Sequence, residues 1–178
     1  MSKVNIIGSI YLGCVIIILA VMAWRHPFTN EIISTNGPAY EQKVNSVAFG
    51  YQLEQQFSPI DRGLDAVEIY INTTECSTES GKLQFSIYDQ NNELCFIQDI
   101  PLSELPEYGW YKVQIDAPLQ KGEQYRMVLE SVDCIDLGPQ ISFFAANQAA
   151  APEQVTDTLR YAGQEVSNAA LRIKFCYE

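Results

Sequence analysis

Apolar and polar side chains alternate with a period of two in a series of short segments that begins near residue 44. In residues 64–72, Val67, Ile69 and Ile71 share one face, and the residues between them share the other. A period of two is the pattern of a β-strand with one buried face. The segments with this pattern are residues 44–57, 64–72, 82–89, 93–100, 110–116, 123–131, 140–145 and 170–178.

This repeated alternation predicts an all-β domain of about eight strands, of which the first, residues 44–57, is long or broken. Half-buried strands favour antiparallel sheets, in which one face packs on a core and the other meets water. Two such sheets packed together give a sandwich or a jelly roll. No stretch with helical periodicity is long enough to support a parallel α/β fold. Only residues 153–160 indicate a helical turn. The sequence therefore predicts an antiparallel β-sandwich (jelly roll) over residues 44–178.

A second feature is the apolar run of residues 4–24, which has no charged side chain and lies between Lys3 and Arg25. About 20 mostly apolar residues in a helix cross the hydrocarbon core of a bilayer. The run predicts one N-terminal transmembrane helix, an uncleaved signal anchor over residues 1–25, followed by a linker over residues 26–43. A cleaved signal peptide is the alternative, although the apolar region of such a peptide usually has only about 7–15 residues.

The charges that flank the run are nearly balanced, so they do not decide on which side of the membrane the sandwich lies. An acidic, strand-rich domain with an even number of cysteines after an N-terminal anchor favours the outside. We expect a single-pass protein of the cell membrane whose C-terminal domain is extracytoplasmic.

The chain is acidic, with 11 Lys and Arg against 22 Asp and Glu and a formal net charge of −11. This balance repels nucleic acid, and no basic stripe offsets it. Anionic lipid head groups repel the domain as well, so the anchor is the expected contact with the membrane.

Four of the five cysteines follow the anchor, and they allow three disulfide pairings, among which spacing alone does not choose. No two of them form a C-x-x-C motif, so a zinc site is not expected. The four are Cys76, Cys95, Cys134 and Cys176, whereas Cys14 lies in the apolar run.

Residues 73–82 and 133–139 form two polar loops that each carry one cysteine. An up-and-down strand order places both loops at the same end of the domain, so we hypothesise a disulfide between Cys76 and Cys134. Carboxylates in these loops are hard oxygen ligands that make a calcium ion the alternative. Their spacing does not match an EF-hand, and we predict no metal. These carboxylates are Glu75, Glu79, Asp133 and Asp136.

Catalysis has little support in the sequence. The single histidine, His26, directly follows the anchor, so a Ser/His/Asp or Cys/His arrangement has no candidate base. Glycosidases need only two carboxylates at a set separation, and 22 acidic residues always offer a pair. We predict that the chain is not an enzyme and has no cofactor, with a two-carboxylate enzyme as an alternative.

Six segments between residues 52 and 177 follow a recognisable order of motifs. A Gln-x-Phe strand and an apolar strand precede a Gly-led strand that ends in a turn, a Trp strand and a Gly-x-x-Tyr strand. The segments are QLEQQFSP, LDAVEIYIN, SGKLQFSIYDQNNEL, YGWYKVQI, KGEQYRMVLES and ALRIKFCY. This order, over about three-quarters of the chain, resembles the galactose-binding-like jelly rolls, which include many carbohydrate-binding modules. The resemblance implies a ligand on loops at one end or on a concave face, and it carries over no individual binding residue.

Aromatic residues supply the candidate ligand-binding surface. Tyr108, Trp110 and Tyr111 form the densest aromatic cluster, beside a glycine. We predict a surface on which a sugar ring stacks, supported by Tyr70 and Tyr88. The structural alternative is that Trp110 packs at the edge of the core or under a loop.

Anchor, fold and aromatic residues together predict a membrane-anchored, extracytoplasmic, non-catalytic binding module for carbohydrate or another cell-envelope polymer. The alternative is an accessory or scaffolding subunit whose sandwich docks on another membrane or envelope protein. A concave aromatic face favours the first, and an exposed apolar patch favours the second.

Overall fold

The parts of the chain that the computed structural model describes are residues 32–33, 42–47, 51–74, 81–132, 141–147, 151 and 153–177. For residues 32–33, 42–47 and 147 it describes the backbone alone. All of these residues belong to the compact unit Glu31–Tyr177. The predicted anchor, residues 1–25, lies outside them. Within the described parts, no helix combines the length and the apolar character needed to cross a bilayer.

Two antiparallel sheets make up the described domain, and the first is sheet A. Its strands follow the order β1-β13-β4-β9-β12, with β2 paired to β9 and β7 paired to β4. The strands of sheet A are β1 (Ile32–Ile33), β2 (Gln42–Val47), β4 (Leu64–Asn72), β7 (Tyr108–Gln114), β9 (Ile141–Asn147), β12 (Ala169–Leu171) and β13 (Ile173–Tyr177).

Sheet B follows the order β11-β10-β3-β8-β5-β6, so β6 is an edge strand. A short 3₁₀ helix, η2 (Leu102–Glu104), comes directly after β6 in the chain. The strands of sheet B are β3 (Gln52–Phe57), β5 (Lys82–Asp89), β6 (Leu94–Pro101), β8 (Tyr125–Val132), β10 (Arg160–Tyr161) and β11 (Gln164–Glu165).

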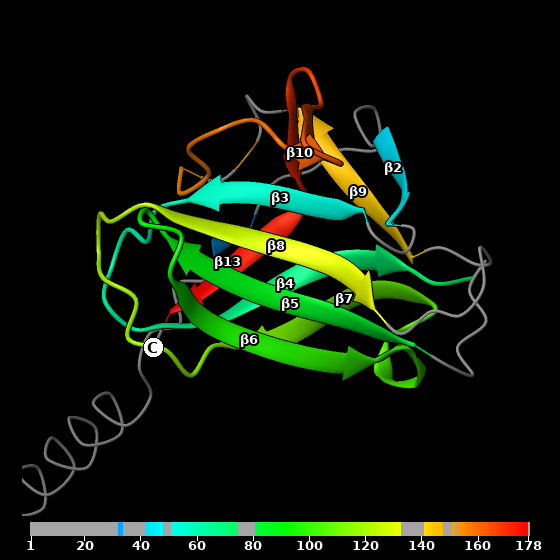
Figure 1. The fold of residues 1–178 in the computed structure, drawn as a ribbon, viewed down its shortest axis with the longest axis horizontal. Helices are drawn as coiled ribbons and strands as arrows, with labels where there is room; N and C mark the ends of the chain where they lie inside the picture. The colour runs from blue at the N-terminus through cyan, green and yellow to red at the C-terminus, as the bar shows by residue number, and fades with distance from the viewer. Residues whose placement is uncertain are drawn as a thin grey trace, which may run out of the picture. The chain divides into compact units, whose positions relative to one another are not determined.

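The two sheets face each other across one apolar core. Figure 1 shows β3, β8, β5 and β6 side by side in front of β13, β4 and β7. Phe57 of β3 and Phe175 of β13 are fully buried, and their ring centroids lie 5.3 Å apart, which joins the two layers. The alternate residues that the sequence assigned to the inside are buried in this core. They include Val67, Ile69, Ile71, Leu83, Phe85, Ile87, Met127, Leu129, Leu171, Ile173 and Phe175.

The fold therefore confirms an all-β domain of two antiparallel sheets. Strands β4 and β5 occupy the ranges 64–72 and 82–89 that alternation predicts. The predicted first strand, residues 44–57, is broken, and its two parts join different sheets as β2 and β3. Parts of the predicted linker, residues 26–43, also contribute backbone pairing, because β1 pairs with β13 and β2 begins at Gln42.

The helical turn predicted over residues 153–160 is wrong. Val155 instead forms an antiparallel bridge with Phe57, and the N–H of Ser58 donates to the carbonyl of Gln154 at 2.8 Å. These bonds place the segment alongside β3, and residues 153–160 contain a turn, a single bridge at Val155 and no helix. Buried Gln55 ties the same segment to the core, because its amide donates to the carbonyl of Asp157 at 2.7 Å.

The predicted Cys76–Cys134 disulfide and the alternative calcium ligands Glu75, Glu79, Asp133 and Asp136 lie outside the described residues. Lys82, the last residue of the first loop, and Val132, directly before the second loop, are cross-strand partners. Cys95 is an exposed thiol, and Cys176 is buried.

Candidate functional site

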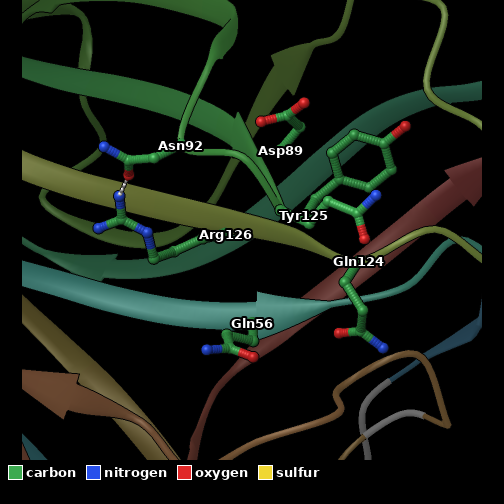
Figure 2. A pocket seen from close by; sticks show the side chains of 7 residues that line it. Gln56, Asp89, Asn92, Gln124, Tyr125 and Arg126 are labelled. Atoms are coloured by element: carbon green, nitrogen blue, oxygen red, sulfur yellow. Dashed lines mark hydrogen bonds between the residues drawn. The ribbon is translucent and has the colours of Figure 1, made fainter.

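One end of the described domain has an opening lined by polar side chains, which we call the hairpin pocket. Its volume is about 270 Å³. The residues come from the end of β3, the β5–β6 turn and the start of β8 (Figure 2). They are Gln56, Asp89, Gln90, Asn92, Gln124, Tyr125 and Arg126.

The β5–β6 turn is shaped by Asp89. One carboxylate oxygen of Asp89 accepts the N–H groups of Asn91 and Glu93, each at 2.8 Å. Asn92 has a φ of 65°, a left-handed conformation that Asn tolerates in turns. The bond from the Glu93 N–H, together with the bonds from Asn91, lowers the pKa of Asp89. The carboxylate is therefore fixed in its charged form at the rim of the pocket.

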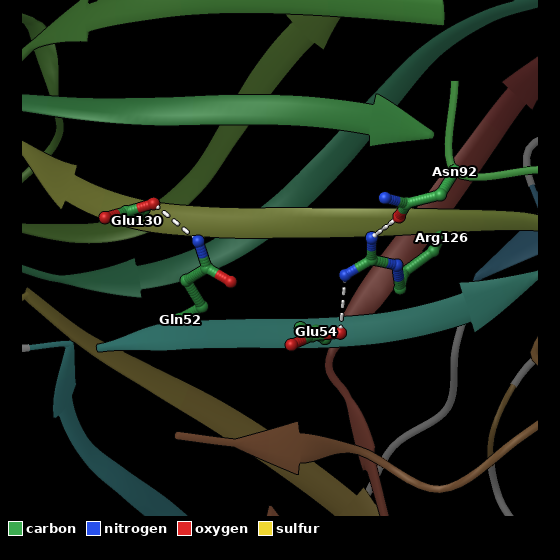
Figure 3. Close-up of polar contacts among 5 residues, drawn as sticks. All are labelled: Gln52, Glu54, Asn92, Arg126 and Glu130. Atoms are coloured by element: carbon green, nitrogen blue, oxygen red, sulfur yellow. Dashed lines mark hydrogen bonds and ion pairs between the residues drawn. The ribbon is translucent and has the colours of Figure 1, made fainter. Parts of the chain in front are cut away.

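Arg126 forms one wall of the pocket and is tethered on three sides. Its guanidinium donates to Glu54 at 2.8 Å and to the side-chain oxygen of Asn92 (Figure 3). The guanidinium also lies 5.0 Å from the ring centroid of Tyr88, its cross-strand partner. Because charge-assisted bonds are the stronger hydrogen bonds, this arrangement orients the pocket wall before any ligand arrives.

The β7–β8 loop is held in place by two further contacts. The hydroxyl of buried Tyr125 accepts the N–H of Gln120 at 2.9 Å. The side-chain oxygen of Gln124 accepts the hydroxyl of Thr156 at 2.9 Å, which leaves the amide nitrogen of Gln124 as a donor.

A second opening of about 260 Å³, the middle pocket, adjoins the first. It shares Asp89, Gln90, Gln124 and Tyr125 with the hairpin pocket, and it adds Gln120 and Glu123. The two openings are therefore neighbours, and their shared lining contains more side-chain amides than carboxylates.

The sequence-predicted aromatic residues lie elsewhere. Tyr70 and Trp110 are cross-strand partners on the outer face of sheet A, and Tyr108 lies beside them. With Phe144 they form a cluster that we call the aromatic face. Ring centroids are 5.0 Å apart for Tyr70 and Trp110, and 5.2 Å apart for Tyr70 and Tyr108. The ring planes cross at 76° and 86°, so these rings pack edge to face and form no flat platform.

Two cations cover rings of the aromatic face. The guanidinium of Arg172 lies 4.1 Å from the centroid of Tyr70, and the ammonium of Lys174 lies 4.3 Å from that of Trp110. Lys174 is also paired with Glu68 at 3.1 Å. These contacts occupy one face of each ring, and Tyr108 remains 54% exposed.

The structure does not bring all five predicted aromatic residues together. Tyr111 pairs with Ile69 and packs against the core, on the face opposite Trp110. Burial raises the pKa of Tyr111. Tyr88 lies in sheet B beside Arg126. Only Tyr70, Tyr108 and Trp110 share a surface.

His26, the single histidine, lies outside the described residues. Within the described ranges, no group of three or more His, Cys, Asp or Glu is placed to ligate a metal ion.

The edge strand β6 provides a third surface. Leu94 and Ile97 are 51% and 48% exposed, and both lie on the outer face of sheet B. Edge strands present unpaired backbone groups that can accept a further strand. Apolar side chains beside such an edge are a feature of strand-addition interfaces.

The turn that ends the Gly-led segment SGKLQFSIYDQNNEL is predicted from the sequence, without a ligand assigned to it. Other residues of the pocket, such as Gln120 and Gln124, are not predicted from the sequence. They lie in a loop rich in Gln and Glu, and this composition is the one local signal that could have indicated them. The pairing of Asp89 with Tyr125 brings this loop to the turn.

Comparisons with known proteins assign no family. No family model matches the chain, and no curated protein matches it. Among solved structures, the chain is similar to a family GH115 4-O-methyl-α-glucuronidase with specificity for decorated arabinogalactans, at 14% identity and a TM-score of 0.35. The match covers 88% of this chain and 17% of that chain, so this chain spans less than a fifth of that enzyme. Values at this level do not indicate a shared function.

Proposed function

We propose that this chain is a membrane-anchored, extracytoplasmic binding module without catalytic activity, and that it binds carbohydrate or another polyhydroxylated polymer of the cell envelope. The ligand lies in the hairpin and middle pockets. The observation that carries the proposal is the number of side-chain amides around these two adjoining openings, namely Gln56, Gln90, Asn92, Gln120 and Gln124.

The chemistry of amides suits hydroxyl groups. A side-chain amide has two N–H donors and an oxygen with two lone pairs, so it can donate to one hydroxyl and accept from the next. The pocket is also held in shape by its own bonds, those of Asp89 to the turn and of Arg126 to Glu54. Such preorganisation reduces the entropy lost on binding.

The finer fold is part of this proposal. A galactose-binding-like jelly roll implies a ligand on the loops at one end, and both pockets lie where strands begin or end. We do not assign Asp89 the role of a general acid, because its lowered pKa is opposite to the raised pKa that such an acid needs.

A glycan array tests the proposal directly. The full-length chain should bind at least one class of neutral or charged oligosaccharide, and the double variant Q90A/Q124A should lose about tenfold or more in affinity, because two hydrogen-bonding amides are removed. Both residues are exposed, so the fold should persist. The control is Q164A, which removes an exposed amide in β11 far from these loops in sequence. Absence of glycan binding by the unmodified chain would refute the proposal.

A second candidate function is docking on another membrane or envelope protein, and the exposed Leu94 and Ile97 on β6 favour it. A photo-crosslinker at position 97 in intact cells should then give one discrete adduct, whereas the same group at position 164 should give none. Identical patterns from both positions would contradict docking at β6.

A further inference from the structure

A third opening adjoins the middle pocket and differs from it in charge. We call it the basic pocket. It has a volume of about 540 Å³, and it shares Gln120 with the middle pocket. Its lining comes from the β3–β4 turn and the β7–β8 loop. The residues are Arg62, Gly63, Pro118, Leu119, Gln120 and Lys121.

The three openings lie at the same end of the described domain and share lining residues, and we call them together the trough. Gln120 joins the basic and middle pockets, and Asp89, Gln90, Gln124 and Tyr125 join the middle and hairpin pockets. The two smaller openings, at about 270 and 260 Å³, are each below the usual range for small-ligand sites, about 300 to 1,000 Å³. A ligand that is elongated along the trough fits this arrangement better than one compact molecule.

The two cations of the basic pocket are unusual in this chain. Among the Lys and Arg side chains that the structure describes, only those of Arg62 and Lys121 make no ion pair, hydrogen bond or ring contact. The carboxylate of Asp61 accepts the backbone N–H of Arg62 at 2.8 Å and makes no ion pair with its guanidinium. The described cations with partners are Lys82, Lys112, Arg126, Arg160, Arg172 and Lys174.

Two unpaired cations that line the same opening attract an anion. An Arg guanidinium can pair with a carboxylate or phosphate through two parallel bonds. The remainder of the trough opposes a dense polyanion, because Asp89 and Glu123 line the middle pocket and the chain has a net charge of −11. A ligand with an isolated anionic group satisfies both conditions.

We propose that the trough binds a glycan of several units and that one anionic group of this glycan, a carboxylate or a phosphodiester, lies between Arg62 and Lys121. This inference rests on the proposed function and specifies its ligand class. Hydroxyl groups of the neutral units meet the amides of the middle and hairpin pockets.

The test uses the full-length chain and an array of mono- and oligosaccharides in neutral, uronate-bearing and phosphate-bearing forms. Oligosaccharides with a single anionic unit should bind about tenfold more tightly than neutral oligosaccharides of the same length, as expected for charge-assisted bonds. Preference for uronate or for phosphate identifies which anion it is. Added salt should reduce the preference, because exposed charges are screened.

The matched variants are R62Q/K121Q and K82Q/K112Q, which remove the same charge from the basic pocket and from strands β5 and β7. The first should abolish the preference for anionic glycans while neutral glycans still bind, and the second should retain the preference. Equal binding of neutral and anionic glycans, or tightest binding of monosaccharides, would overturn this inference and leave the proposed function standing. No glycan binding at all would overturn both.

Discussion

The trough and the aromatic face both contain groups that can bind sugars, yet they differ in what those groups already contact. On the aromatic face, Tyr70 and Trp110 pack edge to face, and Arg172 and Lys174 lie over their rings. In the trough, amides and two unpaired cations line open volume. A dense run of aromatic residues can thus serve the packing of a sheet, whereas a binding surface needs polar groups that keep hydrogen-bonding capacity toward an opening, as the amide nitrogen of Gln124 does.

The largest expected effect is a loss of stability when the aromatic face is disrupted. Trp110→Ala should lower the free energy of unfolding by about 2 kcal/mol, roughly half the cost for a fully buried Trp, because the half-buried indole packs on Tyr70 and contacts Lys174. Chemical denaturation measures this change. Tyr108→Ala, at a 54% exposed position, is the control and should cost less than about 1 kcal/mol.

If Trp110→Ala left stability unchanged and abolished glycan binding, the aromatic face would be the ligand surface. The roles that we assign to the two regions would then be exchanged.

A smaller effect on stability is expected when a wall of the hairpin pocket is changed. Arg126→Ala should destabilise the domain by about 1 to 2 kcal/mol, because Glu54 loses a charge-assisted partner at a site where both side chains are partly buried. It should also weaken glycan binding. Arg160→Ala is the matched control, since its pair with Glu165 is 3.6 Å long and more exposed. Equal losses in the two variants would show that Arg126 has no special part in shaping the pocket.

The smallest effect is the pH dependence of the β5–β6 turn. The N–H groups of Glu93 and Asn91 lower the pKa of Asp89 in the folded state. Asp89 therefore contributes stability that is present above its unfolded pKa and is lost as the pH falls through its folded pKa. Asp89→Asn should flatten the stability profile on the acid side, below about pH 4. An acid limb identical to that of the unmodified chain would show that these bonds do not stabilise the turn.

Local pattern predicts much of the fold. Alternation locates β4 and β5 to the residue, because Val67, Ile69 and Ile71 in β4 and Leu83, Phe85 and Ile87 in β5 are buried at every second position. It does not locate β10 and β11, since two residues are too few for a period and their turn depends on Ala162 with a φ of 51°. It also does not predict that β2 and β3 join different sheets, because both have the same alternating pattern.

The candidate site is less predictable, for physical reasons. The same alternation that identifies β7 places Trp110 and Tyr111 on opposite faces, so neighbours in sequence do not form one surface. The trough depends on pairing between distant strands, which brings the turn after Asp89 to the loop before Tyr125. Whether a cation has a partner also depends on such distant contacts, and no local pattern distinguishes Lys121 from Lys112.

The central claim is that ligand binds in the trough and not on the aromatic face. Its most direct test is a calorimetric titration of one array-identified glycan into the unmodified chain, Q90A/Q124A and Y108A. If the ligand binds in the trough, Q90A/Q124A loses about tenfold or more in affinity and Y108A retains the affinity of the unmodified chain. Retained affinity in Q90A/Q124A together with lost affinity in Y108A would contradict it.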